Sequence, residues 1–192
     1  MTCLLMLPGW HGSGREHWQS RWPALYGDTT RFVRVEQDDW VWPKRGDWMM
    51  RLDETLLSDP RLIQTPAVLV AHSLGCHLVA AWAAHSQHTA RVAGALLVAP
   101  PDLDDAARLP SLPPQLQAWR SVLRQRLPFG VLVLASQNDP YSSVARSAQL
   151  AADWGADFED IGDVGHVNAE SGHGDWPEGW ARLRQAQRRW GI

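Results

Sequence analysis

The sequence predicts an α/β protein in which a parallel β-sheet is covered by helices on both faces. Six short apolar runs recur along its 192 residues, and the stretches between them carry apolar residues at helical spacing. Strands that are buried on both faces read as continuous apolar runs of this kind. Because strands and helices alternate along the chain, the strands are expected to run parallel, with right-handed crossovers.

The six predicted strands span residues 3–7, 32–35, 67–71, 95–99, 131–135 and 158–161. The five helices between them are marked by Trp18, Trp22 and Leu25, by Trp48, Leu52 and Leu56, by Leu78 and Trp82, by Leu116, Trp119, Leu123 and Leu127, and by Val144, Ala148 and Ala151. Ser142 or Ser143 is expected to cap the fifth helix and Gly155 to end it, since serine and glycine favour these positions. A sixth helix follows the last strand, with Trp180, Leu183, Ala186 and Trp190 on its apolar side.

The composition fits one ordinary globular domain over residues 1–192. Hydrophobic residues make up 45% and charged residues 20%, and no linker-like segment divides the chain. The net charge of −3 offers no footprint for nucleic acid, and the arginines at 182, 184, 188 and 189 fit the solvated side of the last helix. No apolar run reaches the ~20 residues that span a bilayer, and no signal peptide is evident. We therefore expect a cytoplasmic protein with neither a nucleic-acid nor a membrane partner, and the sequence identifies no protein partner.

The chain contains few cysteines and many tryptophans. The two cysteines, Cys3 and Cys76, are too few for a disulfide framework, and buried thiols are expected. The chain has twelve tryptophans, and those in the predicted crossover helices are expected to fill the space against the sheet.

The segment Ala-His-Ser-Leu-Gly at residues 71–75 lies where the third predicted strand turns into a helix. Its pattern is similar to the nucleophile elbow G-x-S-x-G, in which a sharp turn presents a serine at the carboxyl end of the sheet. Alanine takes the place of the first glycine here and is still small. Ser73 is therefore a candidate nucleophile, and the alternative is that it caps the following helix.

An acid and a histidine follow two later strands. In parallel sheets functional residues collect at the carboxyl ends of strands, and here the chain order is Ser73, Asp139, His166, as in a Ser-His-Asp triad on this architecture. A serine hydroxyl needs a neutral imidazole to take its proton. His166 is the nearer of two histidines after the last strand, with His173 as the alternative. Asp139 is the predicted orienting acid, with Asp102, after the fourth strand, as the alternative.

Backbone N–H donors and a substrate pocket are expected at the same edge of the sheet. Negative charge that develops on a substrate oxygen needs preformed donors. The N–H of Leu74 is predicted to supply one, and that of Trp10, or of His11 as the alternative, the other. The predicted substrate-pocket residues, which lie on loops at this edge and are expected to wall an apolar acyl site, are His11, Trp40, Trp42 and Trp176.

A dinucleotide site is the main alternative of another kind. Gly12 and Gly14 follow the first strand, and Glu36 near the end of the second is placed to bind a ribose. However, His17 stands where the third glycine of that fingerprint belongs, and no P-loop lysine follows. The chain also lacks H-E-x-x-H and paired C-x-x-C motifs. The sequence therefore predicts no cofactor and no metal site.

With these residues placed, the chain resembles the compact α/β-hydrolases of the serine hydrolase family that includes retinoblastoma-binding protein nine. The segments that carry the resemblance are PGWHGS at 8–13, AHSLG at 71–75, NDPY at 138–141, GHVNAESG at 165–172 and DWPEG at 175–179. The resemblance implies a single-domain α/β-hydrolase fold with a six-stranded core and no large lid, and catalytic roles for Ser73, Asp139 and His166.

The sequence thus predicts a serine hydrolase that cleaves small carboxylic esters, or amides, through an acyl-enzyme. The alternative is a protein-interaction module on the same scaffold, whose biological role is binding. The stretch 102–114, where a lid is commonly inserted, contains Pro110, Pro113 and Pro114 and is expected to form a short stiff rim.

Overall fold

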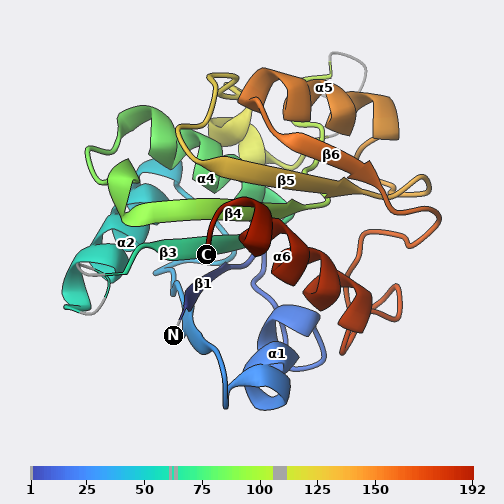
Figure 1. The fold of residues 1–192 in the computed structure, drawn as a ribbon. Coiled ribbons are helices and arrows are strands. Elements are labelled where there is room, and N and C mark those ends of the chain that lie inside the picture. Colours follow the sequence, from blue (N-terminus) through green and yellow to red (C-terminus); the bar gives the residue numbers. More distant parts are fainter. Residues whose placement is uncertain (1, 61, 63–64, 106–111) are drawn as a thin grey trace.

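The computed structural model describes residues 2–60, 62, 65–105 and 112–192, which form a six-stranded sheet in the order β2-β1-β3-β4-β5-β6 (Figure 1). The strands are β1 (Cys3–Leu7), β2 (Arg31–Arg34), β3 (Ala67–His72), β4 (Val92–Val98), β5 (Gly130–Ala135) and β6 (Asp157–Asp160). Every neighbouring pair is parallel. The predicted α/β class and the six parallel strands are confirmed.

Helices cover both faces of this sheet. The helices are α1 (Trp18–Tyr26), α2 (Arg45–Ser58), α4 (Leu74–His85), α5 (Val144–Trp154) and α6 (Pro177–Arg189). Helices α1 and α6 pack on one face, and α2, α4 and α5 pack on the other (Figure 1). Helix α5 begins after Ser143, whose hydroxyl accepts the N–H of Arg146, and ends at Gly155 with φ +68°, as the sequence predicts. Among the described residues, no helix is both long and apolar enough to cross a membrane.

Alternation along the strands divides the core into two layers. Leu5, Leu7 and Leu69 face α2 and α4, whereas Leu4 and Met6 face α1 and α6. The wide spaces between sheet and helices are filled by tryptophans, as expected, and six of these are fully buried: Trp18, Trp22, Trp48, Trp82, Trp119 and Trp154. Both cysteines are also buried.

The prediction of a fourth helix, marked by Leu116 to Leu127, is wrong, although Leu116, Trp119 and Leu127 are buried as its apolar spacing indicated. Only a 3-10 helix, η3 (Pro114–Trp119), is present there. An α-helix would join the N–H of Leu127 to the carbonyl of Leu123, but Trp154 takes both groups. Its indole N–H donates to Leu123 O at 2.8 Å, and its carbonyl accepts Leu127 N–H at 2.9 Å. Pro128, which disfavours helix at the residue before it, reinforces this outcome.

The strand order reverses between β1 and β3, and this is where an open α/β sheet leaves a crevice at its carboxyl edge. Leu7 of β1 lies beside Ala71 of β3 in the ladder. The loop after β1 and the turn after β3 therefore emerge side by side. Helix α4 starts directly after that turn and is buried along most of its length.

Helix α4 carries a histidine that the core keeps neutral. His77 is 3% exposed and donates its Nε2–H to Pro101 O at 2.7 Å. Burial lowers the pKa of His77 to about 4, outweighing that hydrogen bond. A histidine in the unfolded chain has a pKa near 6.5. Between these two values the unfolded chain binds the additional proton, so acid favours unfolding.

We therefore expect the free energy of unfolding to fall as the pH drops from about 6.5 towards 4. The contribution of His77 is of the order of 3 kcal/mol at the acid end. In His77→Gln, whose amide can still donate to Pro101, this part of the loss should disappear. Urea unfolding of both proteins at several pH values measures it, and equal pH slopes would contradict the assignment.

Candidate active site

Ser73 occupies a sharp turn between β3 and α4. Its backbone has φ +54° and ψ −123°, a conformation that costs about 1–3 kcal/mol in a residue with a side chain. The side chain makes no capping hydrogen bond to α4. Its Oγ instead lies 2.9 Å from Nε2 of His166. The turn thus presents the hydroxyl to a histidine, and the alternative role as a helix cap is not what the structure contains.

Two glycines allow the backbones around Ser73 to approach one another. A Cβ added to Gly75 would lie 2.3 Å from the carbonyl oxygen of Leu7, and one added to Gly9 would lie 2.8 Å from the Cβ of Ser73. Neither position has room for a side chain. Ala71, where the elbow pattern has glycine, remains inside β3 and pairs with Leu7, so its methyl group is accommodated in the sheet.

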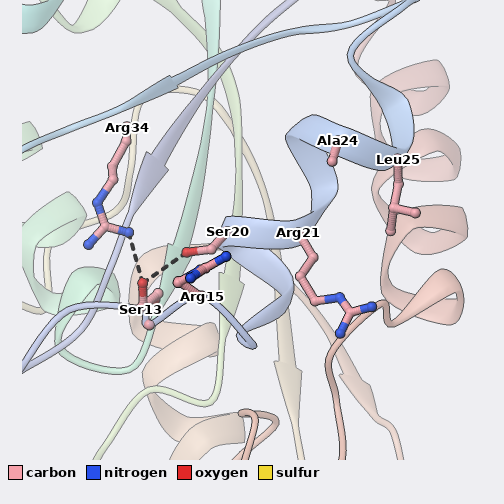
Figure 2. Close-up of a pocket in the computed structure, with 8 residues that line it drawn as sticks. Ser13, Arg15, Ser20, Arg21, Ala24, Leu25 and Arg34 are labelled. Atoms are coloured by element: carbon pink, nitrogen blue, oxygen red, sulfur yellow. Dashed lines mark hydrogen bonds between the residues drawn. The ribbon is translucent and has the colours of Figure 1, made fainter.

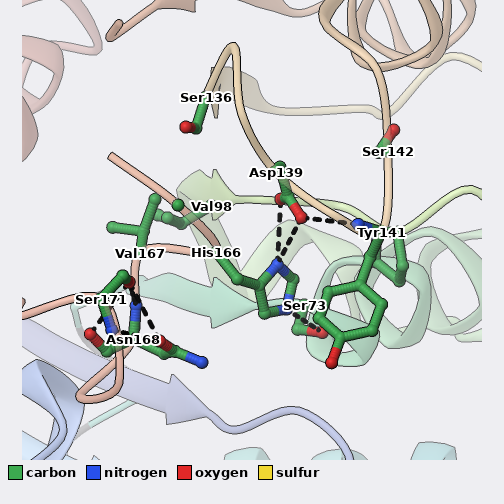
Figure 3. Close-up of polar contacts among 12 residues, drawn as sticks. Ser73, Val98, Ser136, Asp139, Tyr141, Ser142, His166, Val167, Asn168 and Ser171 are labelled. Carbon is green, nitrogen blue, oxygen red and sulfur yellow. Dashed lines mark hydrogen bonds and ion pairs between the residues drawn. The ribbon is translucent and has the colours of Figure 1, made fainter. Parts of the chain in front are cut away.

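His166 bridges Ser73 and Asp139 (Figure 3). Its Nδ1 lies 3.0 and 2.9 Å from the two carboxylate oxygens of Asp139, and its Nε2 faces Ser73 Oγ. Both side chains are buried, so the contact is shielded from water. The backbone N–H of Tyr141 donates to Asp139 Oδ1 at 2.9 Å. The ring of Tyr141 stands edge-on to the imidazole of His166, with 4.5 Å between the ring centroids.

The alternative acid, Asp102, lines the same cavity but makes no contact with His166, and the alternative base, His173, makes none with Ser73 among the described residues. Asp102 forms a two-point ion pair with Arg146, at 2.9 Å to Nε and 3.2 Å to Nη2. Burial alone would raise the pKa of Asp102, but the hydrogen bonds and charge of Arg146 hold it below its ordinary value. His173 donates its backbone N–H to Asn168 O and packs near Trp176. The structure therefore brings Asp139 and His166, and not these two residues, to Ser73.

Side chains of the loop after β5 hold the turn that precedes His166. Asn138 Oδ1 accepts the N–H of Gly165 at 2.6 Å, and Ser136 Oγ accepts the N–H of Val164 at 3.0 Å. The loop after β5 thus holds the loop between β6 and α6, called the histidine loop below, through these two hydrogen bonds as well as through the carboxylate of Asp139. The residue types Ser, Asn and Asp favour such local bonds to backbone, but the sequence pattern does not show which N–H groups they bind.

Two residues that line the cavity with Ser73, Leu74 and Trp10, have backbone N–H groups for which no hydrogen bond is found among the described residues. Leu74 is the first residue of α4, so its N–H has no partner within the helix. In the loop after β1, the N–H of His11 donates to Trp40 O at 3.1 Å, whereas no hydrogen bond is found for the N–H of Trp10 among the described residues. Of the two predicted loop donors, the N–H of His11 is therefore already engaged within the protein.

Buried polar groups fix the position of this loop. Gln19 donates its amide to Leu7 O at 3.2 Å and to Val70 O at 2.9 Å, and it accepts the hydroxyl of Ser13 at 2.6 Å. From the other side, Arg34 donates to Ser13 O at 3.1 Å. The loop is thereby tied to the ends of both β1 and β3. Sequence reasoning did not identify Gln19.

A cavity of about 820 Å³ opens over Ser73 and His166. One wall is apolar and comes from the loop after β4 and from η3, with Leu103, Leu112 and Leu116. The other includes polar side chains of the loop after β1 and the histidine loop, His11, Asn168 and Glu170. His11 was predicted to line the pocket and does so.

The prediction that Trp40, Trp42 and Trp176 wall this pocket is corrected. Trp40 packs edge-on against Trp48 at 5.4 Å and lies under the guanidinium of Arg34. Trp42 points to solvent and is 54% exposed. Trp176 is buried against Trp18 in the layer of α1 and α6. Their loops were placed correctly, but a loop position does not determine where a side chain points.

A second hollow of about 620 Å³ is lined by the loop after β1, by α1 and by Arg34 (Figure 2). Arg21 and Arg34 line it, but both are paired with acids: Arg21 with Glu16 and Asp175, and Arg34 with Glu36. Glu36, the acid of the dinucleotide alternative, is therefore engaged in this ion pair.

Two further histidines stand behind His166, in contact with each other. His72 contacts the rings of His17 and His166, at 4.6 and 4.9 Å between centroids. Burial lowers the pKa of His17 to about 3 and that of His72 well below its ordinary range, and the neighbouring imidazoles act in the same direction. Both rings are therefore neutral near pH 7, and no positive charge adjoins His166 from this side.

Comparison with known proteins agrees with this geometry. The family model described as serine hydrolase matches residues 4–185. A YdeN-like hydrolase from Pectobacterium atrosepticum has a TM-score of 0.82 and 26% identity, over 98% of this chain and 92% of that one. The ydeN gene product of B. subtilis has a TM-score of 0.74 and 20% identity, over 98% and 100% of the two chains. A thermophilic esterase from Thermogutta terrifontis has a TM-score of 0.62 and 17% identity, over 99% and 89%.

Among curated proteins, none matches this sequence. The solved structures below 25% identity show a shared α/β-hydrolase fold. The family model covers nearly the whole chain, including the loops that carry Ser73, Asp139 and His166. The chain belongs to the serine hydrolase family.

Proposed function

We propose that this protein hydrolyses small carboxylic esters, or amides, through an acyl-enzyme formed on Ser73. The observation that carries the proposal is the continuous hydrogen-bonded series from Ser73 Oγ through His166 to Asp139, with contacts of 2.9 Å on both sides of the imidazole. A neutral imidazole in this position can accept the serine proton, and a carboxylate at Nδ1 fixes the required tautomer.

The proposed reaction has two halves. Ser73 Oγ attacks the carbonyl carbon while His166 Nε2 takes its proton, and the oxyanion that forms accepts the N–H groups of Leu74 and Trp10. The C–O or C–N bond then breaks, and His166 returns the proton to the leaving alcohol or amine. In the second half a water attacks the acyl-enzyme with His166 as base, releasing the acid and restoring Ser73.

The neighbours in the fold support an ester as substrate class. One is titled an esterase from Thermogutta terrifontis, and another, with a TM-score of 0.67 and 16% identity, is titled an N-acyl homoserine lactone degrading enzyme. An N-acyl homoserine lactone contains a cyclic ester and an amide, so the second title fits either of the two proposed substrate classes. The apolar wall formed by Leu103, Leu112 and Leu116 suits the acyl chain.

The first test is removal of the nucleophile. Ser73→Ala should reduce kcat for ester hydrolysis by up to ~10⁶, because the attacking oxygen is removed. The fold should remain, since the substitution changes no other contact of the cavity. A fluorophosphonate should label the natural protein, and mass spectrometry should locate the adduct on Ser73. As a control, Ser58→Ala, at the exposed end of α2, should be labelled to the same extent as the natural protein. A folded Ser73→Ala protein with comparable turnover excludes the assignment, and a natural protein that is not labelled favours the interaction module.

The second test distinguishes the two acids. Asp139→Asn should reduce kcat by ~10⁴, since an amide at Nδ1 favours the wrong imidazole tautomer. Asp102→Asn, which weakens the ion pair with Arg146 but leaves the contact between Asp139 and His166 in place, should leave kcat nearly unchanged once corrected for the folded fraction. If the two effects are reversed, the orienting acid lies on the loop after β4.

The third test concerns substrate size. The predicted rim spans 102–114, of which residues 106–111 lie outside the described residues. Leu103, Leu112 and Pro113 line the cavity directly, and η3 follows at Pro114. We expect kcat/KM to fall with acyl length across a series of soluble esters, with no rate increase when the substrate exceeds its solubility. A preference for long-chain emulsions would contradict a short rim.

A further inference from the structure

Two consecutive carbonyls of the histidine loop are held by buried side-chain donors. The carbonyl of His166 accepts Nε2–H of His72 at 2.8 Å, and the carbonyl of Val167 accepts Nε1–H of Trp18 at 2.8 Å. Because a carbonyl only accepts, the imidazole of His72 must carry its proton on Nε2. The donors come from the last residue of β3 and the first residue of α1, which are rigid parts of the fold.

The backbone that these donors hold is unfavourable by itself. Val167 has φ +50°, although a β-branched residue rarely adopts the left-handed region. Such a conformation persists only where the surrounding structure determines it. Val167 is fully buried and Trp18 is 0% exposed, so no solvent can replace the hydrogen bond between them.

The position of the His166 ring depends on this backbone. The carbonyl carbon and the side chain of His166 are bonded to the same Cα, so a shift of the backbone that breaks the hydrogen bond of the carbonyl also displaces the atom from which the ring projects. His72 directly precedes Ser73 in the chain, and it holds the backbone of His166 while Ser73 Oγ meets the ring. His72 thus holds the backbone of His166, and Ser73 contacts its side chain, so both parts of His166 are fixed to the end of β3 and the turn that follows it.

We propose that His72 and Trp18 are positioning residues that set the imidazole of His166 for proton transfer, an inference that rests on the function proposed above. Neither side chain exchanges a proton with Ser73. The low pKa of His72 suits this role, because the ring remains a neutral donor and adds no charge beside an imidazolium at His166.

The same helix offers a matched control for Trp18. Trp22 is also 0% exposed and also donates its indole N–H at 2.8 Å to a carbonyl of this loop, but that carbonyl belongs to Asp175, far along the loop from His166. Trp18→Phe and Trp22→Phe remove equivalent hydrogen bonds and similar packing. A purely structural role predicts similar losses of stability and no difference in catalysis.

We expect Trp18→Phe to reduce kcat and the rate of fluorophosphonate labelling by ~10–100-fold, since small misplacements of a reacting group have effects of this size. KM should change little. Trp22→Phe should show a similar fall in melting temperature with kcat near that of the natural protein. Equal kcat and labelling rates in the two variants would overturn the positioning role of Trp18.

His72 is tested by replacement with and without a donor. His72→Phe keeps a ring but leaves His166 O without a donor, and it should lower kcat and labelling as Trp18→Phe does. His72→Gln restores an N–H near Nε2 and should recover most of the rate. Lack of recovery in a folded His72→Gln protein, or full activity in His72→Phe, would overturn this part of the inference. Natural protein that is neither active nor labelled would instead overturn the proposed function itself.

Discussion

The close approach of two backbones at the reversal of strand order is the constraint on which the site depends. Leu7 and Ala71 are paired in adjacent strands, and Gly75 and Gly9 carry the chain past each other with no space for a Cβ. This contact brings the loop that carries Trp10 and the turn that carries Ser73 and Leu74 to one cavity. A larger residue at either glycine would separate the turn from the loop, so the N–H of Trp10 would move away from Ser73 while that of Leu74, the next residue in the chain, would stay.

The positions of the strands along the chain and the loops that carry Ser73, Asp139 and His166 could be predicted from the sequence, because both follow from local pattern. Apolar runs mark the strands, and parallel strands deliver their following loops to one edge. The stretch 116–127 could not be predicted in the same way. Its apolar spacing is helical, but a distant residue, Trp154, satisfies the backbone groups that a helix would have paired. The directions of Trp40 and Trp176 likewise depend on partners that local spacing does not specify.

Tryptophan has a second role beyond filling space. Five of the six fully buried indoles donate their N–H groups to carbonyls of irregular segments: Trp18 to Val167, Trp22 to Asp175, Trp48 to Asp39, Trp119 to Pro43 and Trp154 to Leu123. The sixth, Trp82, donates to the carboxylate of Asp53 on α2. Each of these five rings therefore anchors a loop to the core while its apolar surface packs against the protein interior. Loops that lack regular hydrogen bonding are held in this way at both faces, which suits a small fold whose functional groups all lie on loops.

Gln19 shows how narrow the chemical requirement at the reversal is. Its amide nitrogen donates to two carbonyls at the ends of β1 and β3, while its oxygen accepts from Ser13. Glutamate has the same shape and differs only in an oxygen for that nitrogen. In the buried site this oxygen would face two carbonyl oxygens with no proton between them, and the repulsion would act on both strand ends at once. An exchange of a single atom would thus push apart the loop and the turn that the glycines bring together.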